Sequence, residues 1–313
     1  MKERIDLIID TDPGVDDALA IMLAASQPHV NLLALTTVHG NVGLSQTTRN
    51  AAKVLDVIES DAAIYPGCAR PLVYLPTENA TRVHGEDGLG DVGIPESQRR
   101  VKTEHAAQAI VRMAREAPGR LTLAAIGPLT NLAVALRLEP DLPRLFKRLV
   151  IMGGAVTGRG NVLTGCAEFN VYSDPEAARI VFDEWGDFEL ADWEATVRHG
   201  FPLETLQEWR ALDTPRAEFY GRISGRVAEF VQRRDETGQM RAADALALSV
   251  VVEPDIVQES EVRYARVETD GASRGLTWVD WENRLDRRAN ARIVLRVDQD
   301  RFMELMRGAL LAG

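Results

Sequence analysis

The stretch Ile8–Asp17, IIDTDPGVDD, joins the end of an apolar run to a turn and four carboxylates. The mostly apolar segment Ile5–Ile9 is typical of a buried strand. Pro13 and Gly14 predict a turn, and the apolar segment Ala18–Ala25 predicts a helix after it. We therefore expect a strand, an acidic turn and a helix in succession, the unit from which open α/β sheets are built.

The four carboxylates of this stretch, Asp10, Asp12, Asp16 and Asp17, follow the predicted strand directly. Ligands of open α/β sheets bind at the carboxyl ends of the strands. Carboxylates this close repel one another unless a cation, a proton or hydrogen-bond donors compensate, and oxygen ligands suit Ca²⁺ or Mg²⁺. One or two of these acids alone would fit a turn or the start of a helix. Four together favour a metal site.

The composition limits the partners of the chain. Its 313 residues allow one large α/β domain or two smaller ones, and 45% hydrophobic and 27% charged residues are ordinary for a globular protein. A net charge of −11 argues against a nucleic-acid backbone or an anionic membrane as partner. A ligand of nucleoside size, which carries no phosphate, stays possible.

Targeting signals are not evident in the sequence. Residues 1–10 are too short and too acidic for a signal peptide, and no apolar run reaches transmembrane length. Cys68 and Cys166 provide no disulfide framework, so we expect two reduced thiols in a cytoplasmic protein.

Strands and helices alternate through the first two-thirds of the chain. The predicted strands are Ile5–Asp10, Asn31–Val38, Ala62–Tyr65, Leu121–Ile126, Arg148–Met152 and Phe188–Ala191. The predicted helices are Asp16–Ser26, Ser45–Ile58, Glu104–Glu116, Leu129–Leu138 and Asp174–Phe182. Residues 66–103 are rich in Pro and Gly and are predicted to be a long loop, typical of a binding lid or of disorder.

The pattern changes after Gly200. Predicted helices span Ala217–Arg234, Arg241–Val251 and Arg301–Leu311, and short strands span Val262–Val267, Leu276–Val279 and Arg292–Val297. No linker rich in Pro, Gly or Ser separates the parts. We therefore predict that residues 1–313 form a single α/β domain, with an open, mainly parallel sheet flanked by helices.

Polar clusters recur where predicted strands end. Besides the acidic turn they are His39-Gly40-Asn41, Ile126–Asn131, Gly153-Gly154 and Asn161–Asn170. Parallel strands place these ends on one edge of the sheet, so the clusters are expected to converge on one pocket.

Two further segments carry candidate site residues. Glu168 and Asn170 flank Phe169 and point to the same side if the segment is extended, which suits the vicinal hydroxyls of a sugar. The alternative is that their polar groups cap a helix. Asp244 lies at the start of an apolar helix, and taken alone it is more typical of an N-cap than of a buried ligand.

The motifs together resemble the nucleoside hydrolase family of the inosine–uridine-preferring type. The resemblance rests on Asp10–Ala18, Thr36–Asn41, Thr48–Ala51, Gly67-Cys68, Pro71-Leu72, His84-Gly85, Gly127–Asn131, Met152–Gly154, Ala167–Asn170 and Asp174–Ala178, in that order along most of the chain. It implies a nucleoside hydrolase-like fold with a Rossmann-like core, and hydrolysis of the N-glycosidic bond of ribonucleosides to ribose and free base. It also implies a homodimer or homotetramer and a role in nucleoside salvage.

The resemblance implies one bound Ca²⁺. By position, Asp12, Asp17 and Asp244 would bind it through carboxylates and Ile126 through its backbone carbonyl, and Asp12 would take a proton from a calcium-bound water. The ribose hydroxyls would be held by Asp16, Asn41, Asn161, Glu168 and Asn170, with Asp10 behind the ligands. Such hydrogen bonds would stabilise an oxocarbenium-like transition state and select ribose over deoxyribose.

The chain differs from the family at the position that the resemblance assigns to contact with the leaving base. Many members carry His immediately before the last calcium Asp, and another subgroup carries Trp there, whereas this chain has Ala243. It therefore resembles an atypical subgroup, and His39 and His84 are the candidates for the missing acid. The segment before Glu168 is also one residue longer than usual, which bears on Asn161.

Two other functions are compatible with parts of the sequence. Asp10-Thr11-Asp12 also resembles the paired aspartates of Mg²⁺-dependent haloacid-dehalogenase-type phosphohydrolases, but lysine is scarce and the later motifs match loosely. A non-catalytic ribonucleoside-binding protein would explain Ala243 but has no need of the base Asp12.

Overall fold

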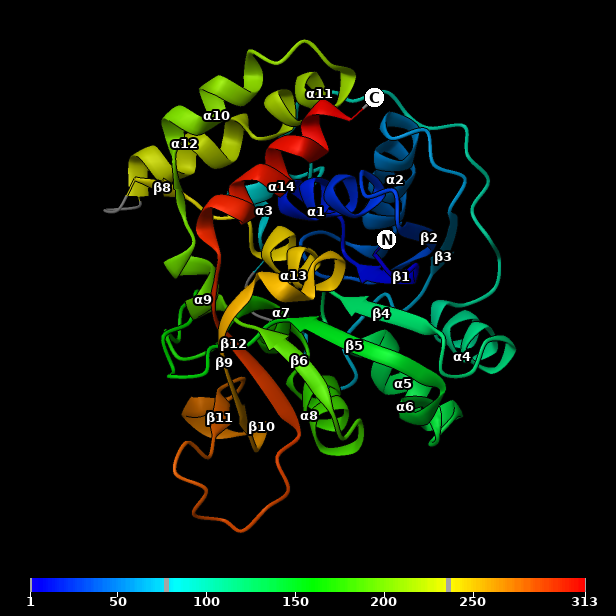
Figure 1. The fold of residues 1–313 in the computed structure, drawn as a ribbon, viewed down its shortest axis with the longest axis vertical. Coiled ribbons are helices and arrows are strands. Elements are labelled where there is room, and N and C mark those ends of the chain that lie inside the picture. The colour runs from blue at the N-terminus through cyan, green and yellow to red at the C-terminus, as the bar shows by residue number, and fades with distance from the viewer. Residues whose placement is uncertain (1, 76–78, 235–237, 313) are drawn as a thin grey trace.

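An eight-stranded sheet forms the centre of the computed structural model, which describes residues 2–75, 79–234 and 238–312 (Figure 1). Its order is β3-β2-β1-β4-β5-β6-β12-β9. The first seven strands are parallel to their neighbours, and only the edge strand β9 runs antiparallel, to β12. The strands of the sheet are β1 (Ile5–Thr11), β2 (Val30–Thr37), β3 (Ala63–Pro66), β4 (Leu121–Ala125), β5 (Phe146–Met152), β6 (Phe188–Ala191), β9 (Val257–Arg263) and β12 (Ala291–Val297). The predicted single α/β domain with a mainly parallel sheet is confirmed.

Helices cover both faces of the sheet. In Figure 1, α1, α13 and α14 lie on one side, and α5, α6 and α8 lie on the other. The helices of the first half are α1 (Val15–Ala25), α2 (Leu44–Val57), α3 (Thr81–His84), α4 (Ala106–Glu116), α5 (Thr130–Leu138), α6 (Leu142–Leu145), α7 (Phe169–Ser173) and α8 (Pro175–Glu184). The later ones are α9 (Trp193–Arg198), α10 (Leu203–Arg210), α11 (Pro215–Ile223), α12 (Gly225–Arg234), α13 (Ala243–Val252) and α14 (Gln299–Leu311).

Strand β1 shows how the apolar sequence produces this arrangement. Leu7 and Ile9 pack into the core that contains α1 and α13, whereas Ile8 packs into the core that contains α4, α5 and α8. All three side chains are fully buried. Because successive residues of a strand point to opposite faces, an uninterrupted apolar run is needed when both faces are covered. Each such side chain contributes ~1.5–3 kcal/mol by leaving water.

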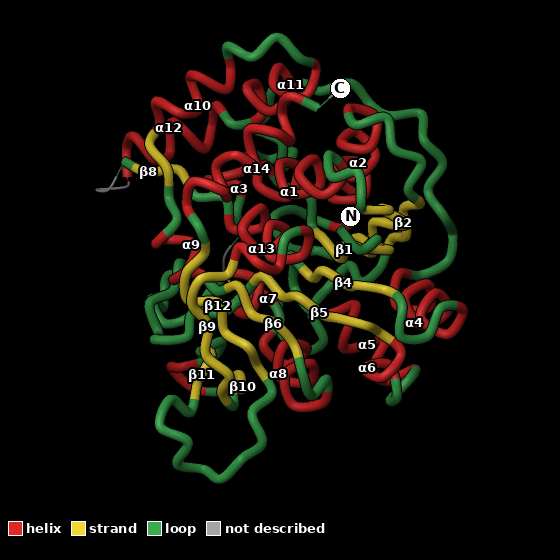
Figure 2. The backbone as a smooth tube through the Cα atoms, viewed as in Figure 1, coloured by secondary structure: helices red, strands yellow, loops and turns green. Residues whose placement is uncertain are grey.

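The second half of the chain differs in three places from the sequence prediction. The predicted helix Ala217–Arg234 is two helices, because α11 ends at Ile223 with Ser224 as its C-cap and α12 begins at Gly225. The predicted strand Val262–Val267 is divided between β9 and β10 (Ala265–Val267), and β10 pairs with β11 (Thr277–Val279) in a separate two-stranded sheet. A second small sheet, β7 (Phe201–Pro202) with β8 (Gln239–Met240), was not predicted. Figure 2 shows β10 and β11 near β9 and β12, and β8 near α12.

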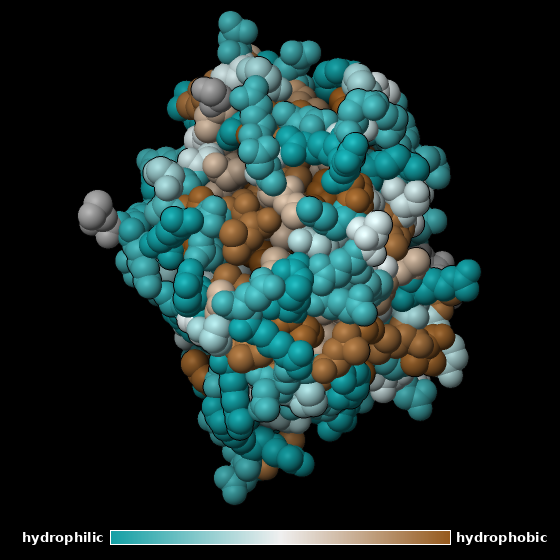
Figure 3. All heavy atoms as spheres, turned by 90° about the vertical axis from the view of Figure 1, so that its right-hand side faces the viewer, coloured by the Kyte–Doolittle hydropathy of each residue, from teal (hydrophilic) through white to brown (hydrophobic). Residues whose placement is uncertain are grey.

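Residues 66–103 are mostly without regular structure, as predicted, but include helix α3; residues 76–78 lie outside the described part. Two short 3₁₀ turns, Pro254–Ile256 and Gly271–Ser273, complete the regular elements. Within the described ranges, no helix is both long and apolar enough to cross a membrane. On the face drawn in Figure 3, hydrophobic residues are visible in separate patches between hydrophilic ones, which is ordinary for a protein surface.

Candidate active site

The predicted site residues meet at the carboxyl edge of the sheet. Asp12 lies between the end of β1 and the start of α1, Asn41 follows β2, and Ile126 follows β4. Asp244 reaches the same place from the first turn of α13. The arrows of β4, β5 and β6 in Figure 1 point toward α7 and α13, on the side where these residues gather.

Asp12 is buried, with 1% of its surface exposed. Its Oδ2 accepts a hydrogen bond of 2.7 Å from the backbone N–H of Asn41. Its Oδ1 is also buried and makes no hydrogen bond within the described part of the chain. Leaving a carboxylate oxygen unpaired away from water costs several kcal/mol, so we expect Asp12 Oδ1 to bind a metal ion or a water molecule.

Two glycines bring backbone close to Asp12. A Cβ atom at Gly40 would lie 2.0 Å from Asp12 Oδ2, and one at Gly127 would lie 2.6 Å from Asp12 Oδ1. Any side chain at either position would collide with the carboxylate. The polar loops after β2 and β4 can therefore close around Asp12 only because these residues are glycine.

Asp17 closes the acidic turn. Its Oδ1 accepts a hydrogen bond of 2.5 Å from Thr11 Oγ1, and its Oδ2 accepts from Gly14 N at 2.8 Å and Asn41 Nδ2 at 3.1 Å. The three donors belong to the end of β1, to the turn itself and to the loop after β2, so the Asp17 carboxylate connects these segments. Its position at the first turn of α1 also suits the helix dipole.

Asp16, Asp17 and Asp244 form a cluster in which carboxylate oxygens of all three lie within 4.8 Å of one another. Asp244 is 3% exposed, and the N-cap of α13 is Ala242, so the interpretation of Asp244 as a cap is wrong. The position of Asp244 follows from its neighbours Asp16 and Asp17 in the folded structure, and not from a local role at the start of α13.

The electrostatics of the cluster are unfavourable without a cation. Burial raises the pKa of Asp12 and of Asp244 well above the ordinary value, and the neighbouring charges of Asp16 and Asp17 raise them further. Burial likewise raises the pKa of Asp16 and of Asp17 to about 6. A divalent ion would remove this cost, and a set of oxygen donors fits a hard ion such as Ca²⁺ or Mg²⁺.

Glu168 is held by three backbone N–H groups. It accepts hydrogen bonds from Gly154 N at 2.9 Å, Asn170 N at 2.9 Å and Val171 N at 3.2 Å, and it is the N-cap of α7. The expectation of an extended segment is therefore wrong here, and the alternative of a capped helix is confirmed. Burial raises the pKa of Glu168 to about 7.

Asn170 and Ile126 contact each other. The Asn170 side-chain amide donates to the Ile126 backbone carbonyl at 3.0 Å. The Ile126 N–H in turn donates to Asp10 O at 2.8 Å, which continues the β1–β4 pairing. The carbonyl that the resemblance assigns to the metal thus lies beside a residue that it assigns to the ribose.

Asp10 lies beneath the acidic turn and is fully buried. Its Oδ2 accepts from Thr36 Oγ1 at 2.6 Å and from Asn131 Nδ2 at 2.8 Å. Asn131 also bonds to the loop after β3, because its Oδ1 accepts from Cys68 N at 2.8 Å. The sequence prediction gave Asn131 no individual role, yet its hydrogen bonds connect the ends of β1, β2 and β3.

The two candidate histidines occupy different places. His84 Nδ1 accepts from Val15 N at 3.2 Å and lies 3.9 Å from Asp16 Oδ1, so His84 borders the acidic cluster. His39 Nε2 lies 3.1 Å from Thr130 Oγ1, whose hydroxyl donates to Asp174 Oδ2 at 2.7 Å. Burial lowers the pKa of both rings to about 4, so both are neutral at pH 7.

Asn161 lies apart from the buried residues, on the exposed loop between β5 and α7. Its backbone N–H donates to Ala167 O at 3.0 Å. The loop is held by Glu194, which accepts from Thr157 N and Thr157 Oγ1, both at 2.7 Å. The sequence prediction noted Glu194 only as a Glu where better-known family members have Asp and assigned it no role, because its partners belong to another loop.

Comparison with known proteins supports the same assignment as the geometry. The profile of the inosine-uridine preferring nucleoside hydrolases matches residues 7–304. A curated relative from Salmonella newport, the non-specific ribonucleoside hydrolase RihC, is 36% identical over 309 residues, 97% of each chain. The chain belongs to the inosine-uridine preferring nucleoside hydrolase family. It is therefore an enzyme that hydrolyses N-glycosyl bonds of ribonucleosides.

Solved nucleoside hydrolases have the same fold. A plant nucleoside hydrolase superposes with a TM-score of 0.93 at 30% identity, and an inosine-guanosine nucleoside hydrolase superposes with a TM-score of 0.92 at 34% identity. Each comparison covers 99% of both chains. Membership of a hydrolase family sets aside the phosphohydrolase and the pure binding protein as interpretations of the sequence.

Proposed function

We propose that this nucleoside hydrolase cleaves the N-glycosidic bond of ribonucleosides in a Ca²⁺-dependent reaction, with Asp12 as the base that activates water. The observation that carries the proposal is the buried, unpaired Oδ1 of Asp12. Asn41 donates hydrogen bonds to both Asp12 and Asp17, and Asp17 forms a cluster with Asp16 and Asp244. A structural role would leave Asp12 Oδ1 without compensation, whereas a metal and a water molecule would provide it.

Four oxygen donors would hold the ion: the carboxylates of Asp12, Asp17 and Asp244 and the backbone carbonyl of Ile126. Asp16 belongs to the same cluster and would face the ribose. A bound Ca²⁺ supplies charge that lowers the pKa of water in its coordination shell. Asp10, held by Thr36 and Asn131, would fix the strand end that carries Asp12.

Asp12 would complete the activation of water. The water oxygen forms a bond to C1′ of the ribose while one of its protons passes to the Asp12 carboxylate. The bond between C1′ and the base nitrogen breaks, and its electron pair leaves with the base. The products are ribose and the free base, which takes up one proton in exchange for the one that water released.

Polar groups around the ribose would stabilise positive charge at C1′. The candidates are Asp16, Asn41, Asn161, Glu168 and Asn170. Glu168 is positioned before substrate arrives, because three backbone N–H groups already fix its carboxylate. Such preorganised acceptors act most strongly where water is excluded.

His84 is the better placed of the two histidines for the leaving base. Because its Nδ1 accepts from the Val15 N–H, the neutral ring carries its proton on Nε2. That N–H is available as a donor beside the acidic cluster. His39 instead uses its Nε2–H on Thr130 and would position the loop that carries Asn41.

The natural assembly and location also belong to the proposal. We propose a homodimer or homotetramer, which the family resemblance supports and light scattering after size-exclusion chromatography would measure. The free thiols Cys68 and Cys166 are compatible with a cytoplasmic enzyme of nucleoside salvage.

The experiment is release of reducing sugar from purine and pyrimidine ribonucleosides and from their 2′-deoxy analogues, in buffer with Ca²⁺. We expect ribose release and a loss of about 10²-fold or more for the deoxy analogues, since hydrogen bonds to the 2′-hydroxyl would be missing. Equal rates for both sugars would contradict the proposed ribose site. No release from any ribonucleoside would overturn the proposed function.

A further inference from the structure

The loop between β5 and α7, residues 157–166, carries Asn161 and lies against Ala167 and Glu168. The N–H of Asn161 donates to Ala167 O at 3.0 Å, and Ala167 directly precedes Glu168, the N-cap of α7. Gly160 permits this close approach, because a Cβ atom there would lie 1.8 Å from Ala167 O. The loop therefore brings the backbone of Asn161 next to the predicted ribose side of the site.

This loop has little apolar packing. Among residues 157–166, only Val162 is buried, and Asn161 itself is exposed. Burial of apolar surface is the main source of order in a protein, and it contributes little to a loop of this kind. The conformation of the loop therefore depends on its hydrogen bonds.

Glu194, in the first turn of α9, accepts the hydrogen bonds at the start of the loop. Its Oε1 accepts from Thr157 N at 2.7 Å and from Arg159 N at 3.4 Å, and its Oε2 accepts from Thr157 Oγ1 at 2.7 Å. Hydrogen bonds to an ionised carboxylate are stronger than those between neutral groups. Both oxygens of one half-buried carboxylate thus hold the loop.

The two residues before Glu194 hold the segment that leads into the loop. Asp192 Oδ2 accepts from Val156 N at 3.1 Å, and the N–H of Trp193 donates to Gly154 O at 2.9 Å. The N–H of Gly154 donates in turn to Glu168 Oε2 at 2.9 Å. The start of α9 therefore fixes residues 154–159 directly beside the Glu168 carboxylate.

We propose that Glu194 is a positioning residue for ribose recognition, because it holds the loop that places Asn161 beside Glu168. This inference rests on the proposed function. Glu194 itself would touch neither the ribose nor the metal. An amide that is already in place loses less freedom when the substrate binds, so its hydrogen bond to a ribose hydroxyl contributes more to binding. Without Glu194, the substrate would have to order the loop first.

The test is a double-mutant cycle of Glu194→Ala and Asn161→Ala, with ribose release from inosine and from uridine as the readout. Each single variant should lower kcat/KM by about 10-fold. The double variant should also lose about 10-fold rather than about 100-fold, since both changes remove the same contact. The losses should be equal for the two substrates, because they share the ribose and differ in the base.

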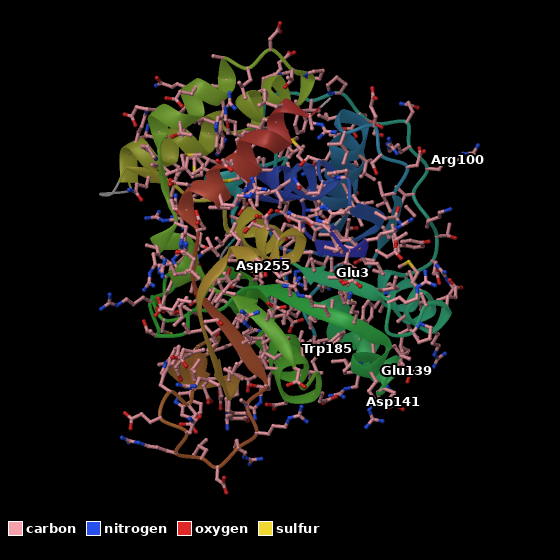
Figure 4. The ribbon with its side chains drawn as sticks, in the orientation of Figure 1. Glu3, Arg100, Glu139, Asp141, Trp185 and Asp255 are labelled. Carbon is pink, nitrogen blue, oxygen red and sulfur yellow. The ribbon has the colours of Figure 1, made fainter. Side chains whose placement is uncertain are left out.

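Two further variants serve as controls. Glu194→Gln keeps an oxygen acceptor for the N–H groups and should recover most of the activity that Glu194→Ala loses. Glu139→Ala is the matched control, because Glu139 also accepts a backbone N–H, that of Asp141 at 3.2 Å. Glu139 is labelled in Figure 4 and lies between α5 and α6, at the amino end of β5 and away from the site. Its removal should leave kcat/KM unchanged.

An additive loss of about 100-fold in the double variant would overturn the role of Glu194. The same holds if Asn161→Ala loses nothing, if the loss is confined to one base, or if Glu194→Gln loses as much as Glu194→Ala. Glu194→Asp, whose shorter side chain cannot reach all three donors, replaces Glu194→Ala in the cycle if that variant does not fold. Failure of the wild type to release ribose from any ribonucleoside would instead overturn the proposed function.

Discussion

Helix α13 carries an acid near each of its ends, and the two acids have opposite properties. Asp244, in the first turn, is buried beside Asp16 and Asp17, and burial with their charge raises its pKa. Glu253, the C-cap, accepts hydrogen bonds from Arg301 at 2.8 Å and Lys2 at 2.6 Å. Hydrogen bonds from Arg301 are the main cause that lowers the pKa of Glu253 to about 2.

The pKa shifts of Asp244 and Glu253 are opposite to those that the helix dipole would cause. The dipole favours an anion at the amino end, where Asp244 lies, and disfavours one at the carboxyl end, where Glu253 lies. Its effect of ~0.3–1 kcal/mol is smaller than the effects of burial and of neighbouring charges. A carboxylate that stays buried among other carboxylates therefore indicates a function, whereas one that is paired with Arg and Lys indicates stability.

The largest effect should come from Asp12→Asn. The amide keeps the shape but cannot take a proton from water, so we expect kcat to fall by about 10³-fold or more. The melting temperature should change little, and Glu253→Gln is the control that should leave kcat unchanged. Initial rates of ribose release measure the effect, and near-normal turnover of Asp12→Asn would remove Asp12 as the base.

Two variants of Glu168 distinguish its proposed catalytic role from its role as the N-cap of α7. We expect Glu168→Gln to lower kcat by about 10²-fold with a smaller change in KM, because the amide oxygen still accepts N–H groups but the charge is gone. Glu168→Ala should also lower stability by about 1 kcal/mol, since α7 loses its cap. Steady-state kinetics and thermal unfolding measure the two effects. A loss confined to KM in Glu168→Gln would argue against transition-state stabilisation.

Asp244 and Glu253 should respond oppositely to neutralisation. In the presence of a chelator, Asp244→Asn should raise stability by about 1 kcal/mol, because it removes buried repulsion. It should also weaken Ca²⁺ binding, measured by calorimetry. If Asp244→Asn destabilises the chelated protein, then Asp244 contributes to the fold rather than to a metal site.

Glu253→Gln should lower stability at pH 7 by about 1 kcal/mol, since a partly exposed ion pair contributes little more. The folded-state pKa of about 2 lies below the ordinary value of 4.5, so the stabilisation is present above pH 4.5 and is lost as the pH falls toward 2. Unfolding of wild type and variant across this range tests the sign. A difference that grows as the pH falls would contradict it.

Sequence alone predicted the strands and the longer helices of the first two-thirds of the chain, because each strand is a dense apolar run and the helices carry many apolar residues. The short helices α3, α6, α7 and α9 were not predicted. The predicted strands there are all present, with ends shifted by one or two residues at most. The sequence prediction failed where tertiary contacts, rather than local sequence, determine the secondary structure. The break between α11 and α12 and the two-residue strands β7 and β8 have no strong local period.

The residues of the candidate site could be predicted from the sequence, but the contacts between their side chains could not. The acidic turn could be located because four carboxylates next to a buried strand have few structural explanations. Glu168 fits an extended or a capping role equally well in sequence, and Gly154, from another loop, fixes its place. Asp244 taken alone was more typical of a cap, because its partners, Asp16 and Asp17, lie far away in the chain, and only the family resemblance assigned it to the metal. The role of Asn161 stays a prediction.

The most direct measurement is the rate of ribose release from inosine as a function of free Ca²⁺, after a chelator has removed all metal. The account predicts that activity falls to background on chelation, returns with added Ca²⁺ and is not restored in Asp12→Asn. Full activity of the wild-type enzyme without metal would contradict the assignment of the buried carboxylates to a catalytic calcium site.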